Sequence, residues 1–204
     1  MRTHSYREKA QRLYATASAQ GGYFTAKQAQ EAGYAKSTHS YNVKVGNWIR
    51  EHRALYRVAN YPAPERPDLI LRSLWSSNRQ GKPQGVYSHQ TALSVHELSD
   101  LNPSKIHMTV PLSFRRNGPI PKVLILHHGA LAKEEIQPMH GFAVTRPLRT
   151  IADLLALNTI QLDHMQQAVR QAFERGLITD SSLESARIPP QVKAQIRKLR
   201  KTDG

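Results

Sequence analysis

Histidines and carboxylates are the residues of this chain that could do catalytic chemistry, but their spacing matches no common catalytic motif. A restriction-type nuclease needs Glu/Asp-x-Lys, because the carboxylate holds a metal ion while the Lys polarises the attack. None of the 15 Asp and Glu residues has a Lys two positions later. His96 and Glu97 begin a zincin motif, but Asp100 stands where its second His should be. We therefore predict no catalytic residues and no cofactor.

A metal site made of three histidines is the alternative that the sequence leaves open. The chain has no Cys, so a Cys-bearing zinc site is excluded. Seven histidines lie on several predicted elements beyond residue 84, namely His89, His96, His107, His127, His128, His140 and His164. Histidines at strand ends are more often hydrogen-bonded packing residues than ligands. We therefore expect no bound metal, although counting alone does not decide the matter.

Positive charge is the strongest chemical signal in the sequence. The chain has 29 Lys and Arg against 15 Asp and Glu, which gives a formal net charge of +14. The first 64 residues hold half of that excess, with ten basic residues and three acidic ones. Such a surface attracts polyanions and gains free energy by releasing their condensed counterions. This predicts nucleic-acid binding; the alternative is a basic protein that binds nucleic acid only incidentally.

The N-terminal segment has the pattern of three helices followed by a hairpin. Apolar residues at helical spacing predict a helix over residues 5–19. Thr25 and Gln28 have the spacing of a capping box, so a second helix runs from there to Gly33. A third helix fits residues 37–45, and two short strands follow at residues 48–52 and 55–58. This order predicts a winged helix-turn-helix domain over residues 1–62.

In that fold the third helix enters the major groove of DNA, and the wing reaches neighbouring phosphates. DNA contacts are therefore expected from the third helix and its approach, from the wing and from the start of the second helix: Lys27, Lys36, Ser37, Thr38, His39, Ser40, Asn42, Lys44, Arg50, Arg53 and Arg57. A solvated basic helix in a protein–protein module is the alternative, since fold alone does not fix function.

The register of the third helix is open between two possibilities. One register buries Thr38, Tyr41, Val45 and Trp48 against the core and turns Lys36, Ser40 and His39 toward DNA. The other buries His39, Asn42 and Val43. We prefer the first, because burying polar side chains costs free energy.

The rest of the chain mixes strands and helices, so the predicted fold class is α+β. Three prolines within residues 60–67 predict a linker. Strands are expected near residues 85–88, 105–111, 122–128 and 142–145, and helices at residues 66–78, 90–98, 162–177 and from Pro147. We predict a mixed α/β domain over residues 66–188, with a small sheet flanked by helices. A basic C-terminal helix or tail follows over residues 189–204.

Residues 85–111 resemble the AbiEi family, the antitoxins of bacterial type IV (AbiE) abortive-infection toxin–antitoxin systems. The matching residues are Ser88, His89, Thr91, Ala92, Leu93, His96, Leu98, Ser99, Asp100, Pro103, Ile106, His107, Thr109, Val110 and Pro111. Residues 144–154 are similar to a second family segment, and the likeness extends upstream to Gly21 and downstream to the family's late helix at residues 167–178. The chain departs from the family at Ala54, where relatives usually have Gly at the wing turn, and at His39 and Asn42, where relatives are often apolar.

The resemblance implies a DNA-binding transcriptional autorepressor with an antitoxin domain. Such proteins bind double-stranded operator DNA, typically at inverted repeats in their own promoter. They oppose a nucleotidyltransferase-like toxin without necessarily forming a stable complex with it. The alternative is a protein-interaction module that neutralises such a toxin directly, with only incidental DNA binding.

The charged residues that match the family suggest a polar cluster in the second domain. We expect His89, His96 and Asp100 to lie with Arg149 and Asp153. The cluster is either an antitoxic surface or a buried hydrogen-bond network that holds the domain together. We prefer the structural role, because no nucleophile accompanies these residues.

The sequence also predicts where in the cell the protein is located. No apolar run approaches the about 18–20 residues that cross a bilayer. The first twelve residues lack the apolar segment of a signal peptide. We therefore expect a cytoplasmic protein without a membrane partner.

Overall fold

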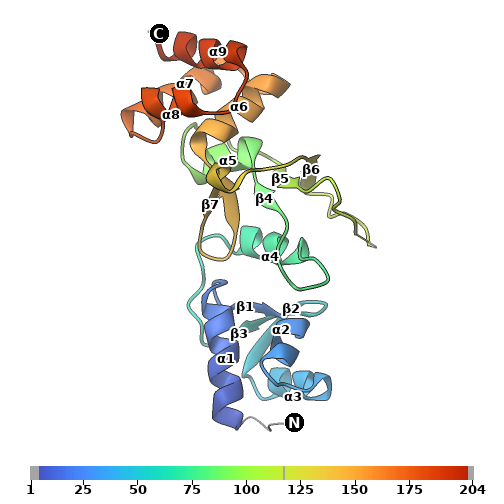
Figure 1. The fold of residues 1–204 in the computed structure, drawn as a ribbon. Helices are drawn as coiled ribbons and strands as arrows, with labels where there is room; N and C mark the ends of the chain where they lie inside the picture. Colours follow the sequence, from blue (N-terminus) through green and yellow to red (C-terminus); the bar gives the residue numbers. More distant parts are fainter. Residues whose placement is uncertain (1–4, 117, 202–204) are drawn as a thin grey trace. The chain divides into compact units, whose positions relative to one another are not determined.

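The computed structural model describes residues 5–116 and 118–201 and has the α+β fold that the sequence predicts. The chain divides into two compact units, which Figure 1 shows from blue to red along the sequence. Unit 1 comprises the residues up to Gln84 together with Met139–Phe142, and unit 2 comprises Gly85–Pro138 and the residues from Ala143 onward.

The boundary between the units differs from the one predicted at residues 62–66. The helix that follows the proline-rich segment belongs to unit 1, because its Ile70 and Leu74 are buried in a cluster with Tyr23 and Leu55. Proline marked an irregular segment correctly, but burial of this amphipathic helix decides which unit it joins.

Unit 1 contains a three-stranded antiparallel sheet with helices before, between and after its strands. Its elements are α1 (Tyr6–Ser18), β1 (Tyr23–Thr25), α2 (Ala26–Glu31), η1 (Lys36–Thr38), α3 (His39–Lys44), β2 (Trp48–His52), β3 (Leu55–Val58) and α4 (Pro67–Trp75). The strand order is β1–β3–β2, so β3 pairs with both neighbours. The three predicted helices and two predicted strands of this region are present; β1 was not predicted.

Two capping boxes fix where α1 and α2 begin. The Ser5 hydroxyl accepts a hydrogen bond from the Glu8 amide, and the Glu8 carboxylate accepts one from the Ser5 amide. The predicted box at the start of α2 is confirmed, since Thr25 Oγ1 accepts from Gln28 N at 3.2 Å and Gln28 Oε1 accepts from Thr25 N at 2.8 Å. Each box satisfies backbone donors that the first helical turn leaves unpaired.

An aromatic core holds the sheet of unit 1 to its helices. Phe24 packs edge-on against Trp48 with ring centroids 5.0 Å apart, and Tyr34 also packs edge-on against Trp48 at the same distance. Tyr56 stacks on Phe24 at 5.8 Å. These rings come from β1, β2, β3 and the loop after α2, so their contacts fix the position of the hairpin relative to the helices.

The turn between β2 and β3 contains a strained residue, which leads to a stability prediction. Ala54 has φ +60, a left-handed conformation that glycine adopts without a Cβ penalty. We expect Ala54→Gly to stabilise unit 1 by about 1 kcal/mol. Gly46→Ala is the matched control, because Gly46 has φ +81 and an added Cβ would meet no atom within 4 Å. The Gly46→Ala variant should destabilise unit 1 through backbone strain alone. Urea unfolding followed by the fluorescence of Trp48 and Trp75 measures the stability of both variants. An Ala54→Gly variant with the same urea midpoint as the wild type would contradict the prediction.

Unit 2 contains a mixed five-stranded sheet and a group of helices. Its elements are β4 (Val86–Tyr87), α5 (His89–Val95), β5 (Ile106–Val110), β6 (Leu124–His128), η2 (Lys133–Glu135), β7 (Ile136–Pro138), β8 (Ala143–Thr145), α6 (Pro147–Leu157), α7 (Leu162–Glu174), α8 (Asp180–Ser185) and α9 (Pro190–Lys201). The strand order is β6–β5–β4–β8–β7, with β5–β6 and β4–β8 parallel. β7 and α8 were not predicted.

The predicted basic C-terminal helix is present as α9, but it packs into unit 2 and is not a separate segment. Val192, Ile196 and Leu199 of α9 are buried in one cluster with residues of α5, α6 and α7. Arg200 lies 4.3 Å above the ring of Phe173 and pairs with Asp180. The basic residues cover the outer face of a helix whose apolar face completes the core.

No helix of the part of the chain that the structure describes is long and apolar enough to span a membrane.

Candidate nucleic-acid interface

The orientation of α3 decides which of its residues can meet a ligand, and the preferred register was wrong. His39 and Asn42 are buried, with exposed fractions of 4% and 5%, whereas Tyr41 is 64% exposed and Val45 47% exposed. The side chains of His39 and Asn42 therefore cannot contact DNA, and both are withdrawn from the predicted contacts. Tyr41, which the sequence analysis placed in the core, joins the exposed face.

Partners inside unit 1 explain why polar residues are buried here. The His39 ring packs edge-on against Trp48 at 5.4 Å and against Tyr56 at 5.8 Å. Asn42 donates its side-chain amide to the Thr38 carbonyl at 2.9 Å, and its Oδ1 accepts from Asn47 at 3.1 Å. The penalty for burying polar groups applies to unpaired ones: Asn42 is paired on both sides, whereas His39 Nε2 has no hydrogen-bond partner in the described part of the chain and only the ring contacts offset its burial.

Burial of His39 also makes the stability of unit 1 depend on pH. Its pKa is lowered chiefly by burial, and further by the charge of Lys36, while the backbone of Tyr34 partly offsets the shift. The unfolded chain therefore binds a proton more readily, so this contribution to stability is complete above about pH 6.5 and is lost as pH falls below it. We expect the urea midpoint of unit 1, measured by Trp fluorescence, to decrease as the pH is lowered from 7 to 5. His39→Gln should show a smaller fall; an unchanged fall would contradict this assignment.

Four of the exposed cations of unit 1 belong to α3, its approach and the hairpin, and we call this set the cationic face: Lys36, Lys44, Arg50 and Arg53. None of the four makes an ion pair with another residue in the ranges 5–116 and 118–201. Lys36 belongs to η1, Lys44 ends α3, Arg50 lies in β2 and Arg53 lies in the turn before β3. They therefore span the helix and the hairpin of the predicted DNA contacts.

Two predicted phosphate contacts are already engaged within unit 1. Arg57 pairs with Glu51 at 3.0 Å, is half-buried, and also donates to the Tyr61 carbonyl at 3.3 Å. Lys27 donates to the Arg79 carbonyl and lies 3.8 Å from Glu31. Arg57 therefore joins β2 to β3, and neither cation is part of the cationic face.

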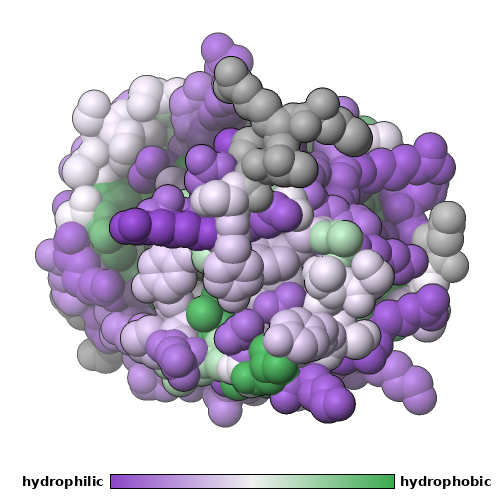
Figure 2. Space-filling view, turned by 90° about the horizontal axis from the view of Figure 1, so that it is seen from below, coloured by the Kyte–Doolittle hydropathy of each residue, from purple (hydrophilic) through white to green (hydrophobic). Residues whose placement is uncertain are grey.

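Exposed hydroxyls lie on the same two elements as Lys36 and Lys44, namely η1 and α3. Ser37 and Ser40 are exposed, and Thr38 is exposed with its hydroxyl donated to the Ala35 carbonyl at 2.7 Å. Serine hydroxyls of this kind donate readily to phosphate oxygens. Figure 2 looks onto the end of unit 1 that carries α3, and its described surface is mainly hydrophilic with small, separate hydrophobic areas.

The polar cluster predicted in the second domain divides into separate groups. Arg149 pairs with Asp153 at 2.8 Å, as predicted, and also with Glu135 at 2.9 Å, which the prediction did not include. His96 is instead hydrogen-bonded to the Thr145 carbonyl at 2.8 Å, and Asp100 accepts from Gln167 at 2.9 Å. These contacts tie α5 and the loop after it to β8 and α7, which is a structural role.

His89 lies with two histidines that the predicted cluster did not include. Its ring stacks on that of His127 with centroids 3.7 Å apart, and His107 Nδ1 lies 3.0 Å from His127 Nε2. Strand pairing was the missing signal, because the sequence does not show that β5 and β6 are neighbours.

A solved structure supports the fold. The RV2827C protein from Mycobacterium tuberculosis is similar to this chain with a TM-score of 0.53 and 12% sequence identity, over 96% of this chain and 83% of that one. At this identity the likeness shows the fold alone. No family model matches the sequence, and no curated protein does.

Proposed function

We propose that this chain is a DNA-binding transcriptional autorepressor and the antitoxin of a type IV, AbiE-like toxin–antitoxin system. In this proposal residues 6–58 form a winged helix-turn-helix, with α3 as the recognition helix and the β2–β3 hairpin as the wing. The observation that carries the proposal is the cationic face, whose four charges lie on α3, its approach and the hairpin without carboxylate partners.

The geometry of unit 1 supports this assignment. The order α1–β1–α2–α3–β2–β3 with the sheet order β1–β3–β2 places one short exposed helix beside a hairpin. A major groove is about 12 Å wide and admits one α-helix, while the hairpin reaches the phosphates beside it. Ser37, Ser40 and Tyr41 would then offer hydroxyl groups to the DNA. Val45 would offer an apolar side chain that can contact a thymine methyl group.

The antitoxin part of the proposal rests on the resemblance of residues 85–111 and 144–154 to the AbiEi family. In unit 2 these residues form β4, α5, β5, the end of β8 and the start of α6. They include the groups that hold the helices of unit 2 to its sheet, and we assign them no catalytic step. The functional partner is a nucleotidyltransferase-like toxin, with the protein acting in the cytoplasm.

A direct protein partner is the second candidate for the same surface. Tyr41 and Val45 are large exposed side chains on α3, and aromatic residues are enriched where proteins bind each other. A toxin that bound there would compete with DNA, so the two candidates predict different effects of duplex on toxin binding.

Salt dependence of binding tests the proposed function. If the four cations each contact a phosphate, log K falls with log salt at a slope of about −3 to −4. Binding to a fragment of the chain's own promoter should then weaken roughly 100-fold between about 50 and about 200 mM salt, measured by fluorescence anisotropy. A random duplex of the same length and composition is the control. Equal affinity for both duplexes at physiological salt would defeat the repressor assignment.

A further inference from the structure

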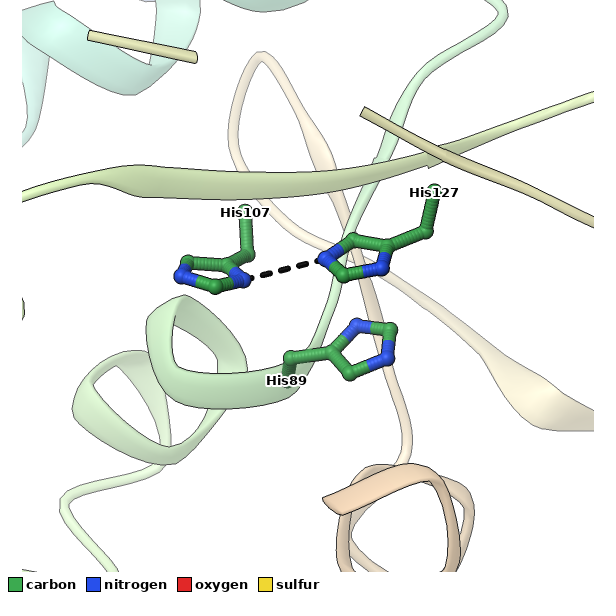
Figure 3. Close-up of side chains that lie close together, drawn as sticks. All are labelled: His89, His107 and His127. Atoms are coloured by element: carbon green, nitrogen blue, oxygen red, sulfur yellow. Dashed lines mark hydrogen bonds between the residues drawn. The ribbon is translucent and has the colours of Figure 1, made fainter. Parts of the chain in front are cut away.

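Three histidine side chains from three different elements of unit 2 meet in one place. Figure 3 shows His89 at the start of α5, His107 on β5 and His127 on β6, with their rings turned toward one another. One ring nitrogen of each lies within 4.8 Å of the others. Imidazole nitrogens from separate elements at such distances are a common ligand set of transition metals.

Strand pairing explains why His107 and His127 meet. In the parallel pair β5–β6, Thr109 is opposite His127 and His107 is opposite Ile125. Side chains alternate between the two faces of a sheet, so His107, Thr109 and His127 lie on one face. The first residue of α5 brings His89 over that face.

The surroundings of the rings favour neutral imidazole. Burial is the main cause that lowers the pKa of His89 to about 3 and that of His107 to about 4, and it lowers the pKa of His127 as well. The neighbouring histidines and Arg149 contribute further to the shift at His89. A neutral imidazole has one N–H and one lone pair, so these rings need a change of tautomer, and no net loss of a proton, to present their lone pairs to a metal ion.

The backbone of His89 carries strain at this point. Its φ is +53, a left-handed conformation that is uncommon for residues other than glycine and costs of order 1–3 kcal/mol. Such strain persists where surrounding contacts hold it, often at ligand sites. The Ser88 hydroxyl lies 2.8 Å from His89 Nδ1 and accepts from Thr109 Oγ1, so these contacts hold the His89 ring in its stacked orientation on His127.

We infer that His89, His107 and His127 form a binding site for a divalent first-row transition metal, with Zn²⁺ as the ion that their chemistry suits. Two ligands of a tetrahedral Zn²⁺, each at about 2.0–2.1 Å, lie roughly 3.3 Å apart. His107 Nδ1 and His127 Nε2 are 3.0 Å apart in a hydrogen bond, which an ion between them would replace with a small outward shift of the two rings.

One ring must turn when the ion binds. A metal lies in the plane of each imidazole that ligates it, whereas His89 and His127 are stacked at an interplanar angle of 18°. Rotation of His89 about its Cβ–Cγ bond would turn a ring nitrogen toward the ion, and it would break the hydrogen bond between His89 Nδ1 and the Ser88 hydroxyl. Arg149 is the cation that acts on His89, and its charge is compensated by Glu135 and Asp153.

The site has a structural consequence within unit 2. β6 is an edge strand of the sheet, and the ion would join it to β5 and to the start of α5. A ligand that binds only the folded state stabilises it in proportion to RT ln(1 + [L]/Kd). Three protein ligands leave the fourth tetrahedral position to water or to a donor from another molecule.

Metal titration of the full chain tests the site. The purified protein, freed of any affinity tag and of metal by a chelator, is titrated with Zn²⁺ by calorimetry and with Co²⁺ by visible absorption. We expect one ion per chain and a Co²⁺ absorption spectrum typical of a four-coordinate ion. We also expect Zn²⁺ to raise the midpoint temperature of thermal unfolding. His127→Gln should lower the affinity at least about 100-fold and abolish the rise in midpoint.

Two further variants make the result decisive. His128→Gln is the matched control, because His128 is exposed and its neighbouring position on β6 puts it on the other face. It should bind Zn²⁺ like the wild type. His89→Asn keeps a residue that tolerates positive φ, so it removes a ligand even if His127→Gln fails to fold. Absence of one-to-one binding in the wild type, or wild-type affinity in a folded His127→Gln or His89→Asn, would overturn the inference.

Discussion

Charge reversal of Lys36, Lys44 and Arg53 together is expected to weaken binding to the chain's own promoter about a thousandfold at physiological salt. Each reversal removes one phosphate contact and adds repulsion, and a contact of this kind contributes about tenfold. The salt slope should fall by about 0.9 for each contact that is lost. Electrophoretic and anisotropy titrations of wild type and triple variant over a salt series measure both effects.

The matched control reverses three exposed cations of unit 2: Lys122, Lys133 and Arg170. Both triple variants have the same net charge, so a difference between them reports position and not overall attraction. Unfolding curves should coincide with the wild type, because the three cations of unit 1 make no ion pairs with the described residues. If the unit 2 variant loses as much affinity as the unit 1 variant, the cationic face is not the DNA-binding surface.

Arg149→Met is expected to destabilise unit 2 by about 2–3 kcal/mol at pH 7. Asp153 is only 16% exposed, its Oδ2 has no partner in the described part of the chain, and Arg149 is its counterion. Removing one partner of a buried pair leaves an uncompensated charge, and the loss lies below the fully buried range because Arg149 is 26% exposed. Far-UV circular dichroism during urea unfolding measures it. Trp fluorescence should change little, since Trp48 and Trp75 both lie in unit 1.

The pH dependence and a matched variant identify the cause. Burial already raises the pKa of Asp153, and Arg149 opposes that shift. Without Arg149 the folded carboxyl holds its proton more tightly than the unfolded one, so the loss should be smaller at pH 5 than at pH 7. Arg197→Met, which breaks an exposed pair with Glu184, should cost less than about 1 kcal/mol. A folded Arg149→Met variant of wild-type stability that no longer opposes the toxin would favour the antitoxic-surface hypothesis over the structural one.

Most helices and strands could be predicted because their signals are local. The capping box at Thr25 and Gln28 and the proline at the start of α6 each act within one helical turn. β1, β7 and α8 have three, three and six residues, too few for periodicity to show. β1 and β7 are strands because each pairs with a distant strand, β3 and β8.

Four of the six basic residues of the candidate site were predicted to be available and are exposed without ion pairs to the described residues, whereas Lys27 and Arg57 are engaged and the orientation of α3 was not predicted. Lys36, Lys44, Arg50 and Arg53 are exposed, as a basic surface requires. His39 was misplaced because polarity argued against burial, while the partners that permit it, Trp48 and Tyr56, come from strands later in the chain. The same limit applies in unit 2, where only the β5–β6 register shows that two histidines face each other.

A nuclease footprint on the chain's own promoter tests the central claim most directly. At physiological salt we predict one or more protected segments over promoter sequence, which disappear with the Lys36, Lys44 and Arg53 triple reversal and persist with the unit 2 control. Uniform protection along the fragment, or an unchanged footprint from the unit 1 variant, would contradict the claim that this face reads operator DNA.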